Sequence, residues 1–246
     1  MILPTMNDDD KGYEVFRMLT TLGDLHKDVK PEVARKFANG TRFPYFQRYT
    51  FTDDKMNKWF VVYGCLSKEH KKKGVYLSFS YITYDVPRKH KQYDVNAGRG
   101  VLLFDHVQMK HWHDNKLTGN EKPSPIMDIV PHAINRYTER YLKPKGMENM
   151  EFGRKIESIM SRWMHFDICA DKMGDTSAAK HMNGSICPYD VYMKGGGMLR
   201  GQVMNDMFIR FFTYISDDMM FDLQKEIQKD MTKEHYQWVR KGLKLG

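Results

Sequence analysis

The chain of 246 residues has few cysteines and no long apolar run. Its three cysteines, Cys65, Cys169 and Cys187, are odd in number and far apart, and no CxxC pair occurs. This argues against a disulfide framework and a cysteine zinc site. No apolar run approaches the roughly 18 residues of a membrane-spanning helix, and the first residues are too acidic for a signal peptide. We therefore expect a protein of the reducing cytoplasm with no membrane partner.

The signatures of several enzyme classes are also absent. The chain has no GxxxxGK(S/T) phosphate loop, no GxGxxG after a predicted strand, no HExxH and no GxSxG. Gly195-Gly196-Gly197 precedes no helix pattern, so we interpret these glycines as a turn. Their neighbour Lys194 leaves phosphate contact open. No cofactor is expected.

Positive charge is concentrated in one part of the chain. The formal net charge is +8, and residues 41–100 hold 12 Lys and Arg against 5 Asp and Glu. Clustered cations beside aromatic residues are typical of a polyanion-binding surface. The alternative is a solvated face that only keeps the protein soluble. The cations of this block include Lys68, Lys71, Lys72, Lys73, Arg88, Lys89 and Lys91.

Hydrophobic periodicity predicts an α+β fold. Residues 1–40 are expected to form a helical lead-in, with helices over 11–23, including Tyr13 on its apolar side, and over 30–37. Residues 41–113 are expected to form a basic antiparallel meander with the lysine run at a hairpin tip. The four strands are predicted in RFPYFQRYTF, NKWFVVYGCLS, GVYLSFSYITYDV and GVLLFDHVQMKHWH.

Residues 126–246 form the third predicted region, after a polar linker at 114–125. Here we expect a helix from Pro131, a helix from Glu148 to about His165 with a buried stripe, and helices from Asp217 and from about Thr232. Three short antiparallel strands lie between them, in ICPYDVYM, MLRGQVMND and MFIRFFTYIS. The three regions are compatible with one compact domain.

The helix predicted over IVPHAINRYTERYL has two different sides. Its apolar side carries Ile134, Tyr137 and Tyr141. Its opposite side carries His132, Arg136 and Arg140, which follow one another at one-turn intervals.

This His/Arg side has the residue types that metal-independent RNA cleavage needs. Such cleavage requires a base for the 2′-hydroxyl, an acid for the leaving oxygen and cations for the phosphorane charge. The helix N-terminus is expected to lower the pKa of His132, which suits a base. Arg136 and Arg140 could hold a phosphate through forked donors. The alternative is an exposed basic helix whose Glu139 and arginines pair with neighbours.

A histidine cluster offers a metal site as a further alternative. His111 and His113 flank Trp112, so their imidazoles would share one side of a strand. Asp105 or Asp114 could supply an oxygen ligand, and His106 would need a bulge to join them. Because HxH pairs also occur at strand ends without a metal, no metal is assigned to the candidate site.

The run H-A-x-x-R-x-x-E-R, formed by His132, Ala133, Arg136, Glu139 and Arg140, resembles a helix of some phage and toxin-like proteins. In those proteins the helix precedes a small antiparallel sheet of the barnase/EndoU/RelE ribonuclease type. The downstream order is similar, with a glycine-centred hairpin at Leu199-Arg200-Gly201 and then a strand ending in FTYIS. The resemblance covers residues 126–220.

The resemblance implies a nucleic-acid-directed protein, with RNA rather than DNA as the partner. It implies catalytic roles for His132, Arg136 and Thr213, or Ser216 in place of Thr213. Phosphate contacts are expected from Arg140, Arg200 and Arg210, and from Lys71, Lys72, Lys73, Arg88 and Lys89 of the basic block. The competing hypothesis is a protein of phage or host interaction that binds nucleic acid or another protein without catalysis.

Overall fold

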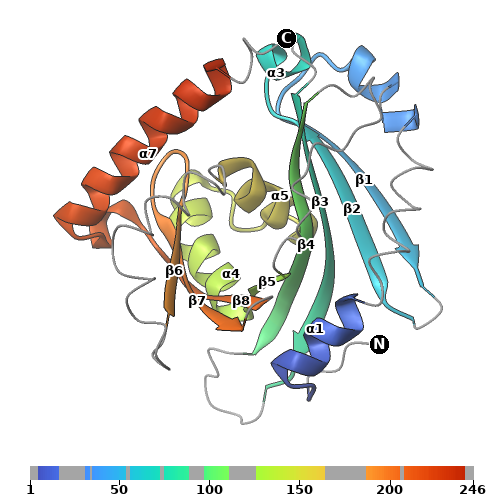
Figure 1. Ribbon diagram of the computed structural model, residues 1–246, viewed down its shortest axis with the longest axis vertical. Helices are drawn as coiled ribbons and strands as arrows, with labels where there is room; N and C mark the ends of the chain where they lie inside the picture. Colours follow the sequence, from blue (N-terminus) through green and yellow to red (C-terminus); the bar gives the residue numbers. More distant parts are fainter. Residues whose placement is uncertain are drawn as a thin grey trace. The chain divides into compact units, whose positions relative to one another are not determined.

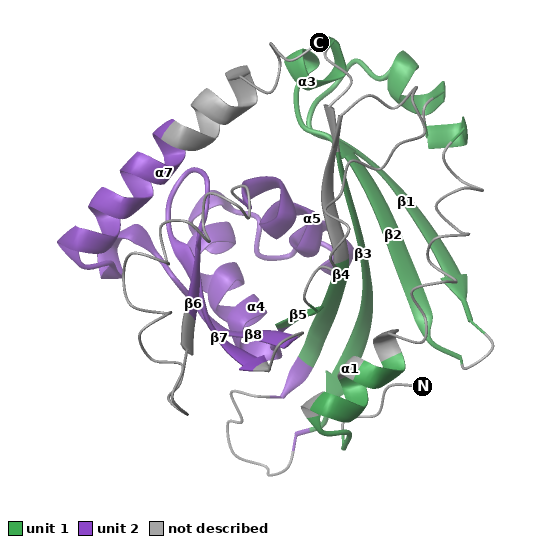
Figure 2. Ribbon diagram, in the orientation of Figure 1, with its two compact units in different colours: residues 1–87, 99–128 green, residues 88–98, 129–246 purple. Residues whose placement is uncertain are grey.

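The computed structural model describes residues 5–16, 31–33, 35–53, 56–72, 75–88, 97–110, 126–163, 187–205 and 208–241. The chain divides into two compact units (Figure 2). Unit 1 comprises residues 1–87 and 99–128, and unit 2 comprises residues 88–98 and 129–246. Both contain helices and antiparallel strands, which confirms the predicted α+β class. The predicted lead-in and the meander both fall in unit 1 apart from residues 88–98.

Unit 1 contains the predicted meander (Figure 1). Its elements are α1 (Asp8–Phe16), β1 (Tyr45–Thr52), β2 (Lys58–Cys65), α3 (Lys68–Lys72), β3 (Val75–Val86), most of β4 (Gly98–Lys110) and most of β5 (Ile126–Ile129). The strand order is β1-β2-β3-β4-β5, and β2 pairs antiparallel with both β1 and β3. The helix predicted at 30–37 is found over 31–33 and 35–39.

Aromatic side chains fill the core of unit 1. The Trp59 ring lies 5.9 Å from Phe51 and 5.2 Å from Phe104, measured between centroids. Phe60 stacks on Tyr81 at 4.8 Å. Ring pairs at these separations add to the stability that burial itself provides.

Helix α1 has a different orientation from the one predicted. It begins at Asp8, where Asn7 Oδ1 accepts a hydrogen bond from the Asp10 amide at 2.8 Å. Tyr13 is 70% exposed, whereas Lys11 is buried with its ammonium 5.6 Å from the Tyr84 ring. The prediction that Tyr13 belongs to the apolar side was therefore wrong. The aliphatic stem of Lys11 and its cation–π contact explain how a lysine can face the sheet instead.

The lysine run lies at the tip of the β2–β3 hairpin, as predicted, and residues 68–72 form helix α3 there. Ser67 Oγ accepts a hydrogen bond from the His70 amide at 3.0 Å, which is the bond of a helix N-cap. Lys71 Nζ donates to the carbonyls of Ala38 and Gly40 at 2.7 and 2.8 Å. Lys71 therefore holds the end of the 35–39 helix, a role that the sequence pattern did not indicate.

Unit 2 combines the predicted helices with a three-stranded antiparallel sheet (Figure 1). Its strands, in the order β8-β7-β6, are β6 (Cys187–Tyr192), β7 (Met198–Asn205) and β8 (Phe208–Ile215). Its helical elements are α4 (Pro131–Tyr137), η2 (Thr138–Leu142), η3 (Lys143–Lys145), α5 (Phe152–Arg162), η5 (Asp217–Met219) and α7 (Asp222–Lys241). The predicted strands of this unit are confirmed. The buried stripe of α5 is also confirmed, because Ile156, Ile159, Met160 and Trp163 are buried.

A β-bulge sets the two faces of β8. Thr213 lies opposite Arg200 whereas Phe211 lies opposite Gly201, so Phe212 is an extra residue in the ladder. The bulge therefore puts Phe211 and Tyr214, three positions apart, on the same face. A Cβ atom on Gly201 would lie only 2.5 Å from the Arg210 carbonyl oxygen, which explains the glycine opposite the bulge.

The turn between β6 and β7 requires its glycines. Gly195, Gly196 and Gly197 have φ angles of 78°, 108° and 76°, in the region that disfavours other residues. The Gly197 amide donates to Asp217 Oδ1 at 2.6 Å. Gln228 Nε2 of α7 donates to the Gly197 carbonyl at 3.0 Å. The turn is thereby linked to both η5 and α7.

The C-terminal part contains one long helix where two were predicted. Residues 217–219 form only the short 3-10 helix η5, and α7 then runs for 20 residues through Thr232. Thr232 Oγ1 donates to the Gln228 carbonyl at 2.7 Å. Because this bond satisfies the hydroxyl inside the helix, Thr232 does not act as the start of a new helix.

We expect Gly197→Ala to lower the free energy of unfolding by about 3 kcal/mol, through backbone strain and overpacking. A Cβ at this position would lie 2.7 Å from the Ile215 carbonyl oxygen and against the Tyr214 hydroxyl. Gly195→Ala is the matched control, because its φ is also positive but no atom lies within 4 Å of the added Cβ. It should cost only about 1 kcal/mol. Urea unfolding followed by circular dichroism measures both, and equal losses would contradict the steric explanation.

Candidate nucleic-acid interface

Helix α4 begins at Pro131, as predicted, and packs along β8. Proline suits this first position because its φ is preset and its missing amide has no helical partner. Ile134 and Tyr137 are buried, and the Tyr137 ring lies 5.2 Å from that of Tyr214 in an edge-on arrangement. The apolar side predicted for this helix is therefore the side that faces the sheet.

The helix widens into a π turn after Tyr137, which the sequence pattern did not predict. The Thr138 hydroxyl donates to the Ile134 carbonyl at 2.9 Å, and the Lys143 amide donates to the Thr138 carbonyl five residues back. As a result Leu142, rather than Tyr141, takes the next fully buried position. Tyr141 is half-buried and stacks on Tyr137 at 5.1 Å. Turns of this kind are frequent at functional sites.

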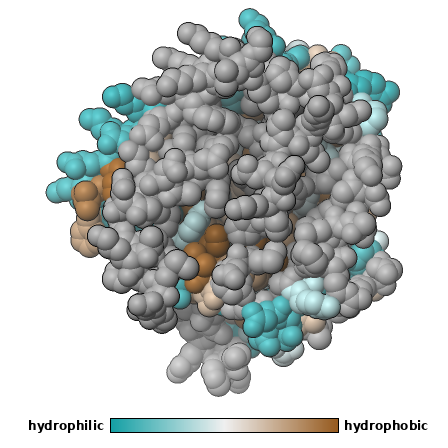
Figure 3. All heavy atoms as spheres, in the orientation of Figure 1, coloured by the Kyte–Doolittle hydropathy of each residue, from teal (hydrophilic) through white to brown (hydrophobic). Residues whose placement is uncertain are grey.

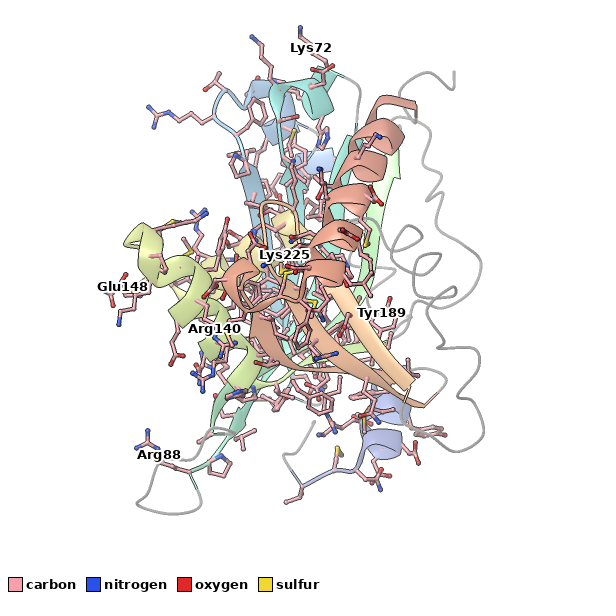
Figure 4. All side chains as sticks on the ribbon, turned by 90° about the vertical axis from the view of Figure 1, so that its left-hand side faces the viewer. Lys72, Arg88, Arg140, Glu148, Tyr189 and Lys225 are labelled. Carbon is pink, nitrogen blue, oxygen red and sulfur yellow. The ribbon has the colours of Figure 1, made fainter. Side chains whose placement is uncertain are left out.

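The two arginines of α4 and η2 have partners close by. Arg136 Nη1 donates to Glu139 Oε2 at 2.6 Å, in an exposed pair. Arg140 Nη1 donates to the Tyr214 carbonyl at 2.5 Å and so ties η2 to the end of β8 (Figure 4). His132 is half-buried and also has a partner. The pairing that was predicted as the alternative to catalysis is present for both arginines.

Thr213 and Arg200 lie together, but on the other face of β8. Arg200 is directly opposite both Thr213 and Asp190, and its Nε lies 3.5 Å from Asp190 Oδ1. Adjacent strand residues point to opposite faces, so Thr213 faces away from the side on which Tyr214 contacts α4. The structure thus groups Arg200 with Thr213, and it does not bring either to the His132 side of α4.

Burial changes the acidity of Asp190, which lies opposite Arg200 on β6. Desolvation raises the pKa of its carboxyl, and the nearby Arg200 guanidinium opposes this only in part.

Two further predicted site residues lie on β8 and directly after it. Arg210, a predicted phosphate contact on β8, is half-buried with its guanidinium carbon 5.5 Å from the Phe208 ring. Ser216 caps η5, where its carbonyl accepts from the Met219 amide.

Arg162, the last residue of α5, was not among the predicted residues. Only 6% of it is exposed, and its Nε donates to the Lys194 carbonyl at 2.9 Å while Nη2 donates to that of Gly196. Its guanidinium carbon lies 3.4 Å from the Tyr141 ring centroid. Two further rings, those of Tyr137 and Tyr214, lie 5.6 and 5.9 Å away. Arg162 thus holds the glycine turn and the tyrosines of η2 and β8 together.

Burial affects the pKa of two tyrosines beside Arg162. It raises the pKa of the Tyr137 and Tyr214 hydroxyls above the ordinary value of 10.0, although Arg162 pulls in the other direction. Tyr137 also shares a 2.7 Å hydrogen bond with Ser158 Oγ of α5. Periodicity could not reveal this cluster, because Arg162 stands beside Trp163 at a position where an exposed charge is the usual expectation.

The basic block contains both structural and exposed cations. Lys71 bonds two carbonyls, as described above, whereas Lys72 and Arg88 are exposed and labelled in Figure 4. Lys73 and Lys89 lie outside the described residues.

The histidine cluster also lies largely outside the described residues. This holds for His111, His113 and Asp114, and for the side chains of Asp105 and His106 on β4. Within the described ranges, no three His, Cys, Asp or Glu residues are placed to share a metal ion. In the same part of the chain, no helix has both the length and the apolar character needed to cross a bilayer.

Comparison of the chain with protein-family models, with curated proteins and with solved structures found no match. A functional inference for this protein has to come from its own residues.

We expect Arg162→Ala to lower the free energy of unfolding by about 3 kcal/mol, because the part-buried carbonyls of Lys194 and Gly196 each lose a donor and the tyrosines lose their cation. Arg162→Lys keeps the charge but not the forked donors, so it should recover only part of this loss. The control is Lys229→Ala at an exposed position of α7, with an expected effect within about 0.5 kcal/mol. Chemical denaturation measures the free energy of unfolding of the three variants. If Arg162→Ala loses no more stability than the control, Arg162 does not hold these elements together.

Proposed function

We propose that this protein binds RNA through the cationic segment, defined as residues 131–145. The segment has four cationic side chains, those of Arg136, Arg140, Lys143 and Lys145, against one carboxylate, that of Glu139. Lysine and arginine contacts to phosphates provide most of the affinity of sequence-independent nucleic-acid binding.

The burial pattern of the segment supports this proposal. Ile134, Tyr137 and Leu142 are buried, so the segment is fixed on one side and presents its cations on the other. Lys143 and Lys145 are both exposed. Lys145 Nζ lies 3.8 Å from the Tyr141 ring, which restrains the ammonium near a definite position. A restrained cation loses less conformational entropy when it binds a phosphate.

The choice of RNA rests on the resemblance of the H-A-x-x-R-x-x-E-R run to the helix of ribonuclease-type proteins. Binding is favoured over cleavage by the position of Thr213. Its side chain faces away from α4, so it does not join His132 and Arg136 in one site. The proposal includes a cytoplasmic location, where RNA is present and where Cys65, a buried free thiol, would remain reduced.

We expect Lys143→Ala/Lys145→Ala to weaken the binding of a fluorescein-labelled single-stranded RNA of 20 nucleotides about tenfold at low salt. Fluorescence anisotropy at several NaCl concentrations measures this. The slope of log Kd against log salt should fall by about 1.4, that is by about 0.7 for each lost phosphate contact. Arg140 is left unchanged in this variant because it also holds β8.

The matched control is Lys229→Ala/Lys233→Ala, which removes the same charge from exposed positions of α7. Its affinity for RNA should stay within about twofold of the unmodified protein. Equal weakening by both variants would show that only net charge matters and would contradict the proposed interface. Absence of RNA binding at 50 mM salt would remove the proposal.

The same RNA should remain intact during incubation with the protein in EDTA, because Thr213 faces away from α4, which carries His132 and Arg136. Denaturing gel electrophoresis monitors the length of the RNA. Cleavage in EDTA that is lost in His132→Ala, with an unchanged circular dichroism spectrum, would instead establish the metal-independent ribonuclease.

A further inference from the structure

Three large apolar side chains are exposed where the chain enters α7. Phe221 is 74%, Leu223 65% and Met219 50% exposed. They occupy a stretch of five residues, and Figure 3 shows hydrophobic atoms in brown at the left margin, over the first part of α7. Single exposed apolar residues are normal on a protein surface, whereas a group of this kind marks an interaction site.

The backbone of this stretch is fixed. The Met219 amide donates to the Ser216 carbonyl at 2.9 Å, and the Met220 amide to that of Asp217 at 3.3 Å. The Phe221 amide donates to Gln224 Oε1 at 2.9 Å, which caps the first turn of α7. Met220, in the middle, is buried and anchors the stretch to unit 2. The three apolar side chains are therefore presented in a defined arrangement.

Carboxylates surround these side chains, although the chain as a whole carries +8. Asp218 and Asp222 stand within the same stretch and are exposed, whereas the neighbouring Asp217 carboxylate accepts the Gly197 amide. A side-chain hydrogen bond from Ser216 lowers the pKa of Asp218. The nearest cation on α7, Lys225, lies 3.8 Å from Asp222 (Figure 4).

We propose that Met219, Phe221 and Leu223 form a docking site for another protein that has an apolar groove with a basic rim. The apolar side chains would fill the groove, and Asp218 and Asp222 would face the rim, as electrostatic complementarity requires. A symmetric dimer of this chain is disfavoured, because it would place the aspartates of the two copies against one another. The inference does not depend on RNA binding, which uses other residues.

The test uses the full chain with the photoreactive residue p-benzoyl-phenylalanine at position 221, expressed and irradiated in the native cells. Position 13, where Tyr13 is equally exposed in unit 1, is the control position for the photoreactive residue. We expect one protein to be cross-linked from position 221 and not from position 13. That protein is then purified and titrated by calorimetry.

Two variants test the two parts of the proposal. Phe221→Ser/Leu223→Ser should raise the Kd for the purified partner by more than about tenfold, since these residues are its anchors. Asp218→Asn/Asp222→Asn should raise the Kd by about threefold and reduce its salt dependence. The control variant Tyr13→Ser/Met56→Ser, also at exposed apolar positions, should leave the Kd for the purified partner unchanged.

Circular dichroism and RNA affinity of the Phe221→Ser/Leu223→Ser variant should match those of the unmodified protein, which separates this inference from the proposed function. The inference is overturned if no cross-link is specific to position 221, or if the cross-linked molecule is RNA. It is also overturned if the cross-linked molecule is a second copy of the chain and sedimentation shows a dimer that the Phe221→Ser/Leu223→Ser variant abolishes.

Discussion

The packing of Arg162 against the tyrosines connects most elements of unit 2. Its guanidinium reaches the glycine turn through two carbonyls and reaches η2 through the Tyr141 ring. Burial of a guanidinium costs free energy unless its charge and donors find partners, so the burial of Arg162 depends on these contacts. The positions of α5, of the turn and of the π turn are therefore interdependent. The position of the cationic segment depends on this cluster, because the same π turn contains both Tyr141 and Arg140.

The bulge in β8 separates two chemical environments on one strand. On one face, Phe211 and Tyr214 pack against Trp163 and Tyr137. On the other face, Thr213 forms a row with Arg200 and Asp190. The resemblance to ribonuclease-type proteins would require one polar residue of the strand to join the helix. The observed geometry does not group Thr213 with His132 and Arg136, and the proposed binding at the helix does not require this grouping.

Much of the fold follows from local sequence patterns. Alternation and aromatic content predicted the described strands other than β5, which has only four residues after the predicted linker. Pro131 predicted the start of α4. These features depend mainly on near neighbours. The features that were missed depend on partners far along the chain or on single hydrogen bonds. Lys71 holds the end of the 35–39 helix, because its ammonium donates hydrogen bonds to the carbonyls of Ala38 and Gly40. Thr232 lies inside α7, because its hydroxyl donates a hydrogen bond to the Gln228 carbonyl.

The candidate site was less predictable than the fold, for a related reason. The helical wheel of the sequence separated the cations from the apolar side correctly as far as Tyr137, and the π turn then shifted the core position to Leu142. Burial of Arg162 requires three tyrosines from three other elements, α4, η2 and β8, which no local pattern records. Spacing alone also could not show that Thr213 faces away from α4, since strand pairing decides that direction.

The extra residue in β8 bears on how this chain can vary in length as well as in sequence. Phe212 is partly exposed, so many side chains would be tolerated there. Deletion of Phe212 would place Phe211 and Tyr214 two positions apart, and simple alternation would then keep both rings on the core face. Insertion of a second residue would instead require a wider bulge or a shift in the register of the strand. Relatives of this protein should therefore tolerate the replacement or loss of this one residue more readily than the gain of another.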